Sequence, residues 1–353
     1  MKVNIIIVTY KRRKMLEECL RSLERAYAEA RENFCDFKVF VGFNGDPEAY
    51  FHFKNGGHFS KIFSFSLIEE ALTPAAARNY LLAKIEEAWV LFLDDDVALP
   101  ETYFVEFLKI VNEYPEVQIL GGPNINFTSA TESERLQALV LGSWWGAGPF
   151  SPRYQKRPRH KSRNSSSLIL CQLWIYKKLE LELRFSPNLL CAEENELFSR
   201  QFRSENIEYF YFPDLFVYHH RRESLRQFFL QCIKFGKGRS QWISSKPYSK
   251  YLIGVIWAAA VIAIFCSLLW SFFCALLIAV FKRKLSSAVS IFKYCFSLQA
   301  GYFLGIILGY RIQPESRKSS LFSRTSIKSD PNHRDLVLES PIKTIATVGS
   351  RQK

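Results

Sequence analysis

Charge is missing from a long stretch near the C-terminal end of this 353-residue sequence, because no residue from 252 to 281 is charged. As one helix this stretch would extend about 45 Å at 1.5 Å per residue, whereas the hydrocarbon core of a bilayer is about 30 Å thick. A helix of this length in a soluble core would show a polar face. The absence of charged residues over this length argues against an ordinary soluble helix and predicts a membrane segment.

Paired cysteines are also missing. The sequence has eight cysteines but no CxxC pair, and Cys266, Cys274 and Cys295 lie in apolar stretches. This pattern excludes a disulfide framework and a zinc site, and it predicts free thiols in a reducing compartment. The first residues do not have the form of a signal peptide, because a basic run at residues 11–14 follows the short apolar run of residues 5–8.

Acidic residues are scarce beside the uncharged stretch. The formal net charge is +13, and residues 221–250 include eight Lys or Arg residues and one acidic residue. Basic charge next to a membrane segment is typical of the cytoplasmic side and attracts anionic lipid. No aromatic and basic recognition motif for nucleic acid accompanies it. We therefore expect a protein of the cell inner membrane with a cytoplasmic main domain, membrane lipids as partners and no nucleic-acid partner.

Strand and helix patterns alternate over the first third of the sequence. Short apolar or β-branched runs predict strands at residues 2–10, 37–43, 62–67 and 88–93. Apolar residues at helical spacing predict helices at residues 17–30 and 103–112. Thr73 and Pro74 suit the cap and first turn of a further helix through Asn79. The alternation predicts an α/β fold with a mostly parallel sheet flanked by helices, and ligand sites at the carboxyl ends of its strands.

Three consecutive carboxylates, Asp94, Asp95 and Asp96, follow the fourth of these strands. Three negative charges at one strand end are unfavourable unless a cation neutralises them. Mg2+ and Mn2+ take such oxygen ligands and bridge them to phosphate-bearing substrates. A solvated acidic turn is the alternative. Thr9 and Asn44 also end predicted strands, so we expect these polar residues to meet at one edge of the sheet.

Five segments resemble, in the same order, motifs of the family 2 glycosyltransferases, which have the Rossmann-like GT-A type fold. The segments are IIIVTYKR (residues 5–12), TPAAARN (73–79), LFLDDDVALP (91–100), CAEENEL (191–197) and YHHRRESLRQFFLQCIKFGKGRS (218–240). They are similar to the family's nucleotide-binding turn, small-residue helix, Asp-x-Asp metal motif, acidic catalytic motif and the His-Arg and Gly-x-Gly-Arg element of its membrane-bound members. The likeness covers about residues 1–245.

The resemblance implies roles for individual residues. Those expected to bind the nucleotide-sugar donor are Thr9, Tyr10, Asn44, Arg78, Asp94 and Asp95. Those expected to hold a divalent metal ion, Mn2+ or Mg2+, are Asp96, Asp94 and His219, and imidazole suits Mn2+ better. For Arg78 a charge on the helix surface is the alternative, and for His219 a structural role at a strand end.

The acidic motif departs from the family pattern. The family has Glu-Asp where this chain has Glu193 and Glu194. By position Glu194 would be the catalytic base that deprotonates the acceptor hydroxyl, although its side chain is one methylene longer. Glu193 and Glu196 are alternatives, and they share a helical face at i, i+3. An acidic first turn favoured by the helix dipole is the structural alternative.

Two further features leave alternatives open. Many relatives have an acidic residue at Phe43 that contacts the nucleobase, so here Asp46 or Asn44 would replace it or the base would be held by stacking. The nucleotide therefore stays undecided. Residues 135–178 lack acidic residues and cluster basic ones such as Arg153. This stretch is either a loop over an anionic substrate or a basic surface near the membrane.

The apolar C-terminal part has two segments. Residues 252–281 are long for one transmembrane helix and short for two, and we favour a tight hairpin near residues 267–271 that keeps both basic flanks inside. The second segment, residues 288–310, would form an interfacial helix or a further crossing. Its glycines recur at four-residue spacing and would let it approach another helix closely: Gly301, Gly305 and Gly309.

From the resemblance and the composition we expect a GT-A-type domain at residues 1–245, membrane-anchoring helices at 246–310 and a disordered basic tail at 311–353. The resemblance implies an inverting glycosyltransferase that moves a sugar from a nucleotide-sugar donor to a lipid-linked or cell-envelope glycan acceptor at the cytoplasmic membrane face. A nucleotidyltransferase is the alternative enzyme, although the turn after residue 8 lacks the glycines of a phosphate loop. An inactive membrane-tethered binding protein is the other alternative.

Overall fold

The computed structural model describes residues 1–56, 59, 61–178, 183–189, 191–201, 207–244 and 249–311. Residues 1–312 form one compact unit. The basic tail that the sequence predicts to be disordered lies, from residue 312 on, outside the described residues.

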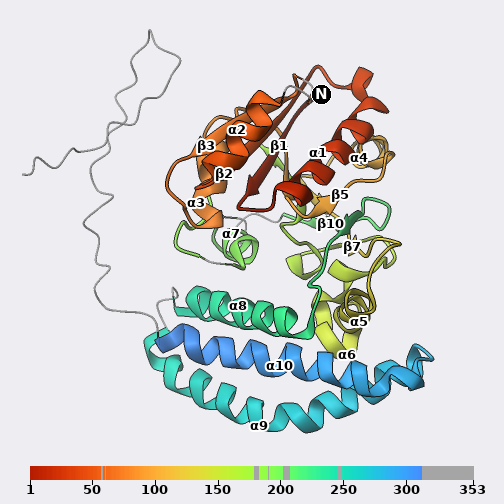
Figure 1. Ribbon diagram of the computed structural model, residues 1–353, viewed down its shortest axis with the longest axis vertical. Coiled ribbons are helices and arrows are strands. Elements are labelled where there is room, and N and C mark those ends of the chain that lie inside the picture. Colours follow the sequence, from red (N-terminus) through yellow and green to blue (C-terminus); the bar gives the residue numbers. More distant parts are fainter. Residues whose placement is uncertain are drawn as a thin grey trace, which may run out of the picture. The chain divides into compact units, whose positions relative to one another are not determined.

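An eight-stranded mixed sheet forms the core of this unit (Figure 1). Its order is β3 (Phe63–Ile68), β2 (Asp36–Asn44), β1 (Lys2–Thr9), β4 (Ala88–Asp94), β9 (Gln172–Lys177), β6 (Ile119–Gly121), β10 (Tyr209–Tyr211) and β8 (His160–Ser162). The four strands predicted from apolar runs are β1 to β4, and they are parallel neighbours. β9 runs antiparallel between β4 and β6. The predicted α/β fold is confirmed, and its parallel half carries the predicted strand ends.

A small second sheet extends the edge where β4 ends. Its order is β5 (Val97–Ala98), β11 (Val217–His219) and β7 (Asn124–Ile125). β11 is antiparallel to β5 and parallel to β7. Since β5 follows β4 after two residues, this sheet brings a distant part of the chain to the carboxyl end of β4.

The chain also forms helices, of which some pack on the two faces of the large sheet, whereas those near the C-terminal end pack with one another. Within the described residues the helices are α1 (Arg13–Ala28), α2 (Pro47–Asn55), α3 (Pro74–Leu82), α4 (Tyr103–Glu113), α5 (Glu132–Leu141), α6 (Trp144–Ala147), α7 (Glu193–Gln201), α8 (Leu225–Ser244), α9 (Ser249–Phe281) and α10 (Ala288–Arg311). Side chains alternate along β1, so Ile5 and Ile7 pack with α1 and α4, and Ile6 packs with α3 and α7. The helices predicted at residues 17–30, 73–79 and 103–112 are confirmed as α1, α3 and α4.

The segment that ends β2 also starts a helix. The sequence pattern predicts only a break at residues 44–47, whereas α2 begins at Pro47. The Asp46 side chain accepts a hydrogen bond from the Ala49 amide at 3.1 Å. Asp46 is therefore the N-cap of α2, with proline in the first turn, which is a favourable start for a helix.

The predicted hairpin near residues 267–271 is wrong, because α9 runs without interruption from Ser249 to Phe281. Ser271, near the expected turn, donates a hydrogen bond to Gln299 of α10 at 2.9 Å instead. The chain reverses at the basic residues 282–284, and α10 returns alongside α9 (Figure 1). A serine that bonds to a neighbouring helix leaves the helix it belongs to intact.

One helical segment of the described chain, Leu285–Gly309, is long and apolar enough to span a membrane by length and composition. Cys266–Phe281 is a shorter apolar helix. More than half of the Leu285–Gly309 stretch is buried inside the protein, as the core helix of a soluble protein would be. The membrane segment expected at residues 252–281 stays a prediction.

The predicted close approach at the α10 glycines is present, and the partner is α8. A Cβ placed on Gly305 would overlap the carbonyl oxygen of Ile233, and Gly301 and Gly309 face α8 in the same way. Gly236 of α8 lies opposite Gly305. These contacts leave no room for side chains, so the two backbones touch directly.

Gly305→Ala should therefore destabilise the protein by about 1–3 kcal/mol, the usual range for overpacking a tight contact. The matched control is Gly254→Ala in α9, where an added Cβ meets nothing within 4 Å. That control should be neutral or stabilising by up to about 1 kcal/mol, because alanine favours the helix over glycine. Thermal unfolding of the detergent-purified full chain would measure both. Equal effects of the two substitutions would contradict a close-packed seam.

Candidate active site

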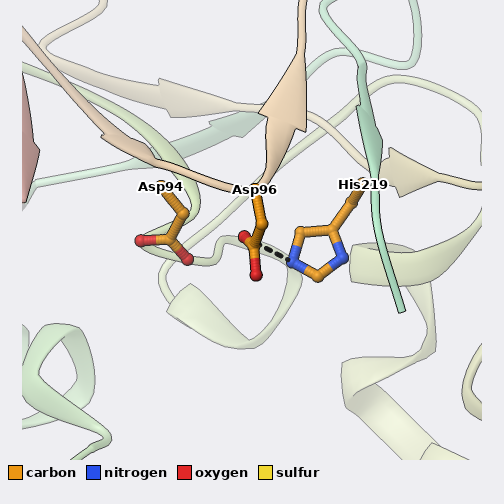
Figure 2. A group of neighbouring side chains, drawn as sticks. All are labelled: Asp94, Asp96 and His219. Carbon is orange, nitrogen blue, oxygen red and sulfur yellow. Dashed lines mark ion pairs between the residues drawn. The ribbon is translucent and has the colours of Figure 1, made fainter. Parts of the chain in front are cut away.

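The carboxyl end of β4 carries the three consecutive aspartates. Asp94 is the last residue of β4, and Asp95 and Asp96 form the turn into β5. β11 pairs with β5 so that His219 lies opposite Val97. This register brings the imidazole next to Asp96, and Figure 2 shows the side chains of Asp94, Asp96 and His219 together.

Asp94, Asp96 and His219 form a candidate metal site. One possible ligand atom from each residue lies within 4.8 Å of the others. Asp96 Oδ1 is 3.3 Å from His219 Nε2, yet among the described residues this buried oxygen has no hydrogen-bond partner, nor has His219 Nδ1. A buried carboxylate oxygen without a donor is unfavourable. A divalent ion would satisfy it, and the oxygen and nitrogen donors fit Mn2+ or Mg2+.

Arg12 neutralises part of the aspartate charge. Its Nη1 lies 3.1 Å from Asp95 Oδ1 and 2.7 Å from Asp96 Oδ2. The Thr9 hydroxyl donates to Asp95 Oδ2 at 2.7 Å. Sequence reasoning did not place Arg12 in the site, although it closes the IIIVTYKR segment three residues after Thr9. The end of β1, through Thr9, and the turn after it, through Arg12, thus both reach the aspartates.

The two buried aspartates differ in proton affinity. Burial and the neighbouring charge of Asp96 raise the pKa of Asp95 to about 6. Burial acts in the same direction on Asp96, but His219 and Arg12 outweigh it and lower the pKa of Asp96 below its usual range. Asp96 is therefore ionised at neutral pH, as a metal ligand must be.

Arg78 connects the aspartates to the acidic motif of α7. The Thr73 side chain caps α3 by accepting from the Ala76 amide, and Arg78 follows on this helix. Arg78 Nη2 lies 3.0 Å from Asp94 Oδ1, and its Nη1 lies 2.5 Å from Glu193 Oε2. The side chain is buried, so the alternative of a surface charge is wrong.

The second acidic residue has its own arginine. Glu194 Oε1 lies 3.3 Å from Arg153 Nη1, and both side chains are about nine-tenths buried. Arg153 also donates through Nε to the Ser166 carbonyl at 2.6 Å, and its Nη2 has no hydrogen-bond partner among the described residues. Arg153 is thus neither a loop-surface charge nor near bulk water. In the sequence, Arg153 was indicated only by its place in residues 135–178, a basic stretch that contains no acidic residue.

The backbone before α7 aims these carboxylates. Ala192 has φ +62°, a conformation that L-residues with a Cβ rarely adopt, immediately before the helix starts at Glu193. Strained backbone of this kind is concentrated at functional sites. Glu196 pairs with Arg200 at 2.7 Å and does not join Arg78 or Arg153. Of the three glutamates, Glu193 and Glu194 are the ones held by the arginines of the site.

Several predicted donor-binding residues are not brought to the aspartates. Tyr10 is about half exposed. The Asn44 amide exchanges two hydrogen bonds with the Leu72 backbone, at 2.9 and 2.8 Å. Phe43 is fully buried among core aromatics, so its ring is not open to a nucleobase. Asp46 accepts a hydrogen bond from the Lys11 amide besides capping α2, so it holds the turn after β1.

The chain is similar to known glycosyltransferases in sequence and in fold. A family model described as Glycosyl transferase family 2 matches residues 4–179. The mannosyltransferase PcManGT from Pyrobaculum calidifontis, solved in complex with GDP-Man and Mn2+, is 15% identical, with a TM-score of 0.53 over 88% of this chain and 87% of that chain. TarS 1–349 from S. aureus, solved in complex with UDP-GlcNAc, is 13% identical, with a TM-score of 0.44 over 88% of this chain and 92% of that chain. A search of curated proteins finds no match.

Residues 4–179 are a glycosyl transferase family 2 domain, and the chain is a glycosyltransferase with the GT-A type fold. At 15% identity the mannosyltransferase supports the fold.

Glu193 gives the site a measurable pH dependence of stability. Burial, together with the charge of Glu194, raises the pKa of Glu193 to about 7 against the lowering effect of Arg78. A carboxyl group whose pKa is higher in the folded state binds more protons when folded, so stability falls as pH rises from about 4.5 to about 7. At about 1.4 kcal/mol per pKa unit this fall is about 3 kcal/mol.

Glu193→Gln should remove the loss of about 3 kcal/mol in unfolding free energy that titration of Glu193 causes as the pH rises. Denaturant unfolding at pH 5 and pH 7.5 in EDTA would measure it. The control Glu48→Gln changes a mostly exposed carboxylate paired with Arg13 and should leave the fall unchanged. A Glu193→Gln protein with the full pH dependence of the parent would show that this carboxyl group titrates normally.

Proposed function

We propose that this glycosyltransferase uses a nucleotide-sugar donor and a divalent metal ion, and transfers the sugar with inversion to a lipid-linked or cell-envelope glycan acceptor. The observation that carries this proposal is the Arg78 bridge, which places the candidate metal ligand Asp94 beside Glu193 and, through it, Glu194. A metal site and an acidic motif at one location are what an inverting transfer needs. The mannosyltransferase with GDP-Man and Mn2+ supports the donor class and the metal.

In this proposal Asp96, Asp94 and His219 hold the metal ion, which when bound would neutralise the diphosphate of the donor. Thr9 and Arg12 fix Asp95 next to the nucleotide. Tyr10, directly after β1, and Asn44, the last residue of β2, would contact the donor away from the aspartates. Arg78 stays charged between two carboxylates and orients Asp94 toward the donor. These roles follow from position and charge.

Glu194 is the proposed base. Its Oε1 takes hydrogen bonds from Arg153 and Asn195, at 3.3 and 3.0 Å, and its Oε2 has no partner among the described residues. Oε2 would accept the proton of the acceptor hydroxyl while the hydroxyl oxygen attacks the anomeric carbon and the nucleoside diphosphate leaves from the opposite face. Glu193 is the alternative base, because a pKa of about 7 lets it hold a proton near neutral pH.

The C-terminal helices would attach the enzyme to the cytoplasmic face of an inner membrane. The basic residues at 221–250 precede the apolar helices α9 and α10, as expected for a segment held by anionic lipid. We therefore keep the division into a catalytic domain at residues 1–245 and anchoring helices at 246–310 as part of the proposal. Attachment would raise the local concentration of enzyme near a lipid-linked acceptor.

Asp96→Asn should abolish release of nucleoside diphosphate from nucleotide sugars with Mn2+. It should also remove the stabilisation by Mn2+ with GDP or UDP, which is about 2.7 kcal/mol at a hundredfold excess over the dissociation constant. Asp36→Asn, at the opposite end of β2 from the site, is the control and should keep both properties. Turnover that survives Asp96→Asn, or that EDTA does not affect, would rule out the metal role.

Glu194→Gln should lower the rate of transfer by about 10²–10⁴, the usual contribution of a general base, with donor binding kept. Glu193→Gln is the matched comparison, since both substitutions conserve size and remove one buried carboxylate. Single-turnover rates and donor affinity should be measured for both. If Glu193→Gln loses the rate and Glu194→Gln stays near the parent, the base is Glu193.

A further inference from the structure

The outer side of α9 is a continuous apolar face that nothing in the described part of the chain covers. Large side chains along it are between 46% and 78% exposed: Ile262, Leu269, Phe272, Leu276 and Val280. Buried residues such as Cys274 and Ile278 lie on the opposite side of the helix and pack against α10. From residue 262 to 280 the face extends about 27 Å at 1.5 Å per residue. Such a face on a folded protein marks a binding surface.

The surroundings of this face fit a lipid leaflet. Lys282, Arg283 and Lys284 follow it directly and are exposed, and residues 224–314 contain no Asp or Glu. Trp270 and Trp144 are each at least half exposed beside it. Basic side chains and tryptophans at the border of an apolar surface are typical of the interface between water and anionic lipid.

The packing of α9 argues against a crossing. Phe273 lies nine residues before Lys282, about 13 Å along the helix and near the middle of a hydrocarbon core about 30 Å thick. There its ring packs against Trp145, with ring centroids 6.1 Å apart. If α9 crossed the bilayer with residues 282–284 at the surface, α6 of the catalytic unit would have to lie at the bilayer midplane.

The packing of α10 leads to the same conclusion. Gly301 faces Cys232 of α8, and Gly309 faces Ser240, so the two helices run parallel and in contact along this whole stretch. α8 carries cations on the same stretch: Lys234, Lys237 and Arg239. A crossing α10 would take these charges into hydrocarbon, which is strongly unfavourable.

α8 is also tied to the acidic motif. Cys191 lies two residues before Glu193. Its thiol donates a hydrogen bond to the Lys234 carbonyl of α8 at 3.0 Å. A Cβ on Gly238 would overlap the Cys191 sulfur. The catalytic motif therefore sits on one side of α8 while α10 packs on another, so α10 is held to the catalytic unit along its contact with α8.

From these contacts we infer that α9 lies in the plane of a single membrane leaflet, with its apolar face in the lipid, and that neither α9 nor α10 crosses the bilayer. This inference rests on the proposed membrane attachment and states its geometry. Leu285–Gly309 is apolar because it is the packed middle helix between α8 and α9 (Figure 1), and the exposed face of α9 meets the lipid.

The first test measures binding of the full chain to vesicles of phosphatidylcholine with and without phosphatidylglycerol. Phe272→Glu should lower the partition coefficient by about tenfold or more, because it removes a large side chain from the lipid. The matched control is Phe51→Glu on α2, a phenylalanine of similar exposure on the catalytic unit, which should bind like the parent. Phosphatidylglycerol should strengthen binding, and high salt should weaken that gain. Unchanged binding of Phe272→Glu would overturn the inference.

The second test measures depth. Spin labels are placed singly at residues 262, 269 and 276 in a chain whose exposed cysteines, Cys35 and Cys266, are replaced by serine. An in-plane helix gives similar immersion depths at all three positions. A depth that passes through the bilayer midplane along the helix would show a crossing. A chain that binds no vesicles and forms a dimer broken by Phe272→Glu would assign the face to a second copy.

Both tests are binding measurements made without donor, so they are independent of catalysis. Asp96→Asn should bind vesicles like the parent, and loss of sugar transfer in that variant concerns the proposed reaction alone. Loss of binding in Phe272→Glu with release of nucleoside diphosphate intact would support the membrane geometry alone.

Discussion

Charge balance at the carboxyl end of β4 is the constraint on which the rest of the site depends. The carboxylates of residues 94–96 meet those of Glu193 and Glu194, and buried carboxylates repel one another unless cations separate them. Three arginines from different elements lie between them: Arg12, Arg78 and Arg153. Because each arginine is fixed by its own helix or turn, the relative positions of β1, α3 and α7 are set by these ion pairs as much as by apolar packing. Removing one partner would leave an uncompensated buried charge, which typically costs about 3–5 kcal/mol.

This balance is incomplete at one atom. Arg12 and Arg78 occupy oxygens of all three aspartates, yet within the described residues Asp96 Oδ1 has an imidazole beside it and no hydrogen bond. His219 reaches this point only because β11 adds to β5 in a defined register. Pairing in the small sheet therefore adds His219 to the two aspartates, which gives three possible metal ligands. A site prepared in this way would bind a cation with little rearrangement, since its ligands are already held by strand pairing.

The C-terminal helices pack closely on α8 of the catalytic domain. α8 touches the start of the acidic motif through Cys191 and Gly238, and it touches α10 through Gly236. At Gly236 the backbones of α8 and α10 touch, so a displacement of α10 has no soft side chain to absorb it. The acidic motif and α10, against which α9 packs, are thus joined through α8. An acceptor held at the leaflet and a donor held at β4 would meet at a geometry set by α8.

The sequence by itself determined the parallel strands, α3 with its Thr73 cap, and the strand-end position of the three aspartates, because these follow from local periodicity and capping. It also indicated the glycine contact of α10 but not that its partner is α8. Tertiary structure alone decided that Phe43 is a core residue, that α9 continues through the serines, and that Arg153 is buried beside Glu194. The reason is physical: a local pattern reports propensity, whereas the partner of a buried charge or of an apolar face is set by chain segments far away in the sequence.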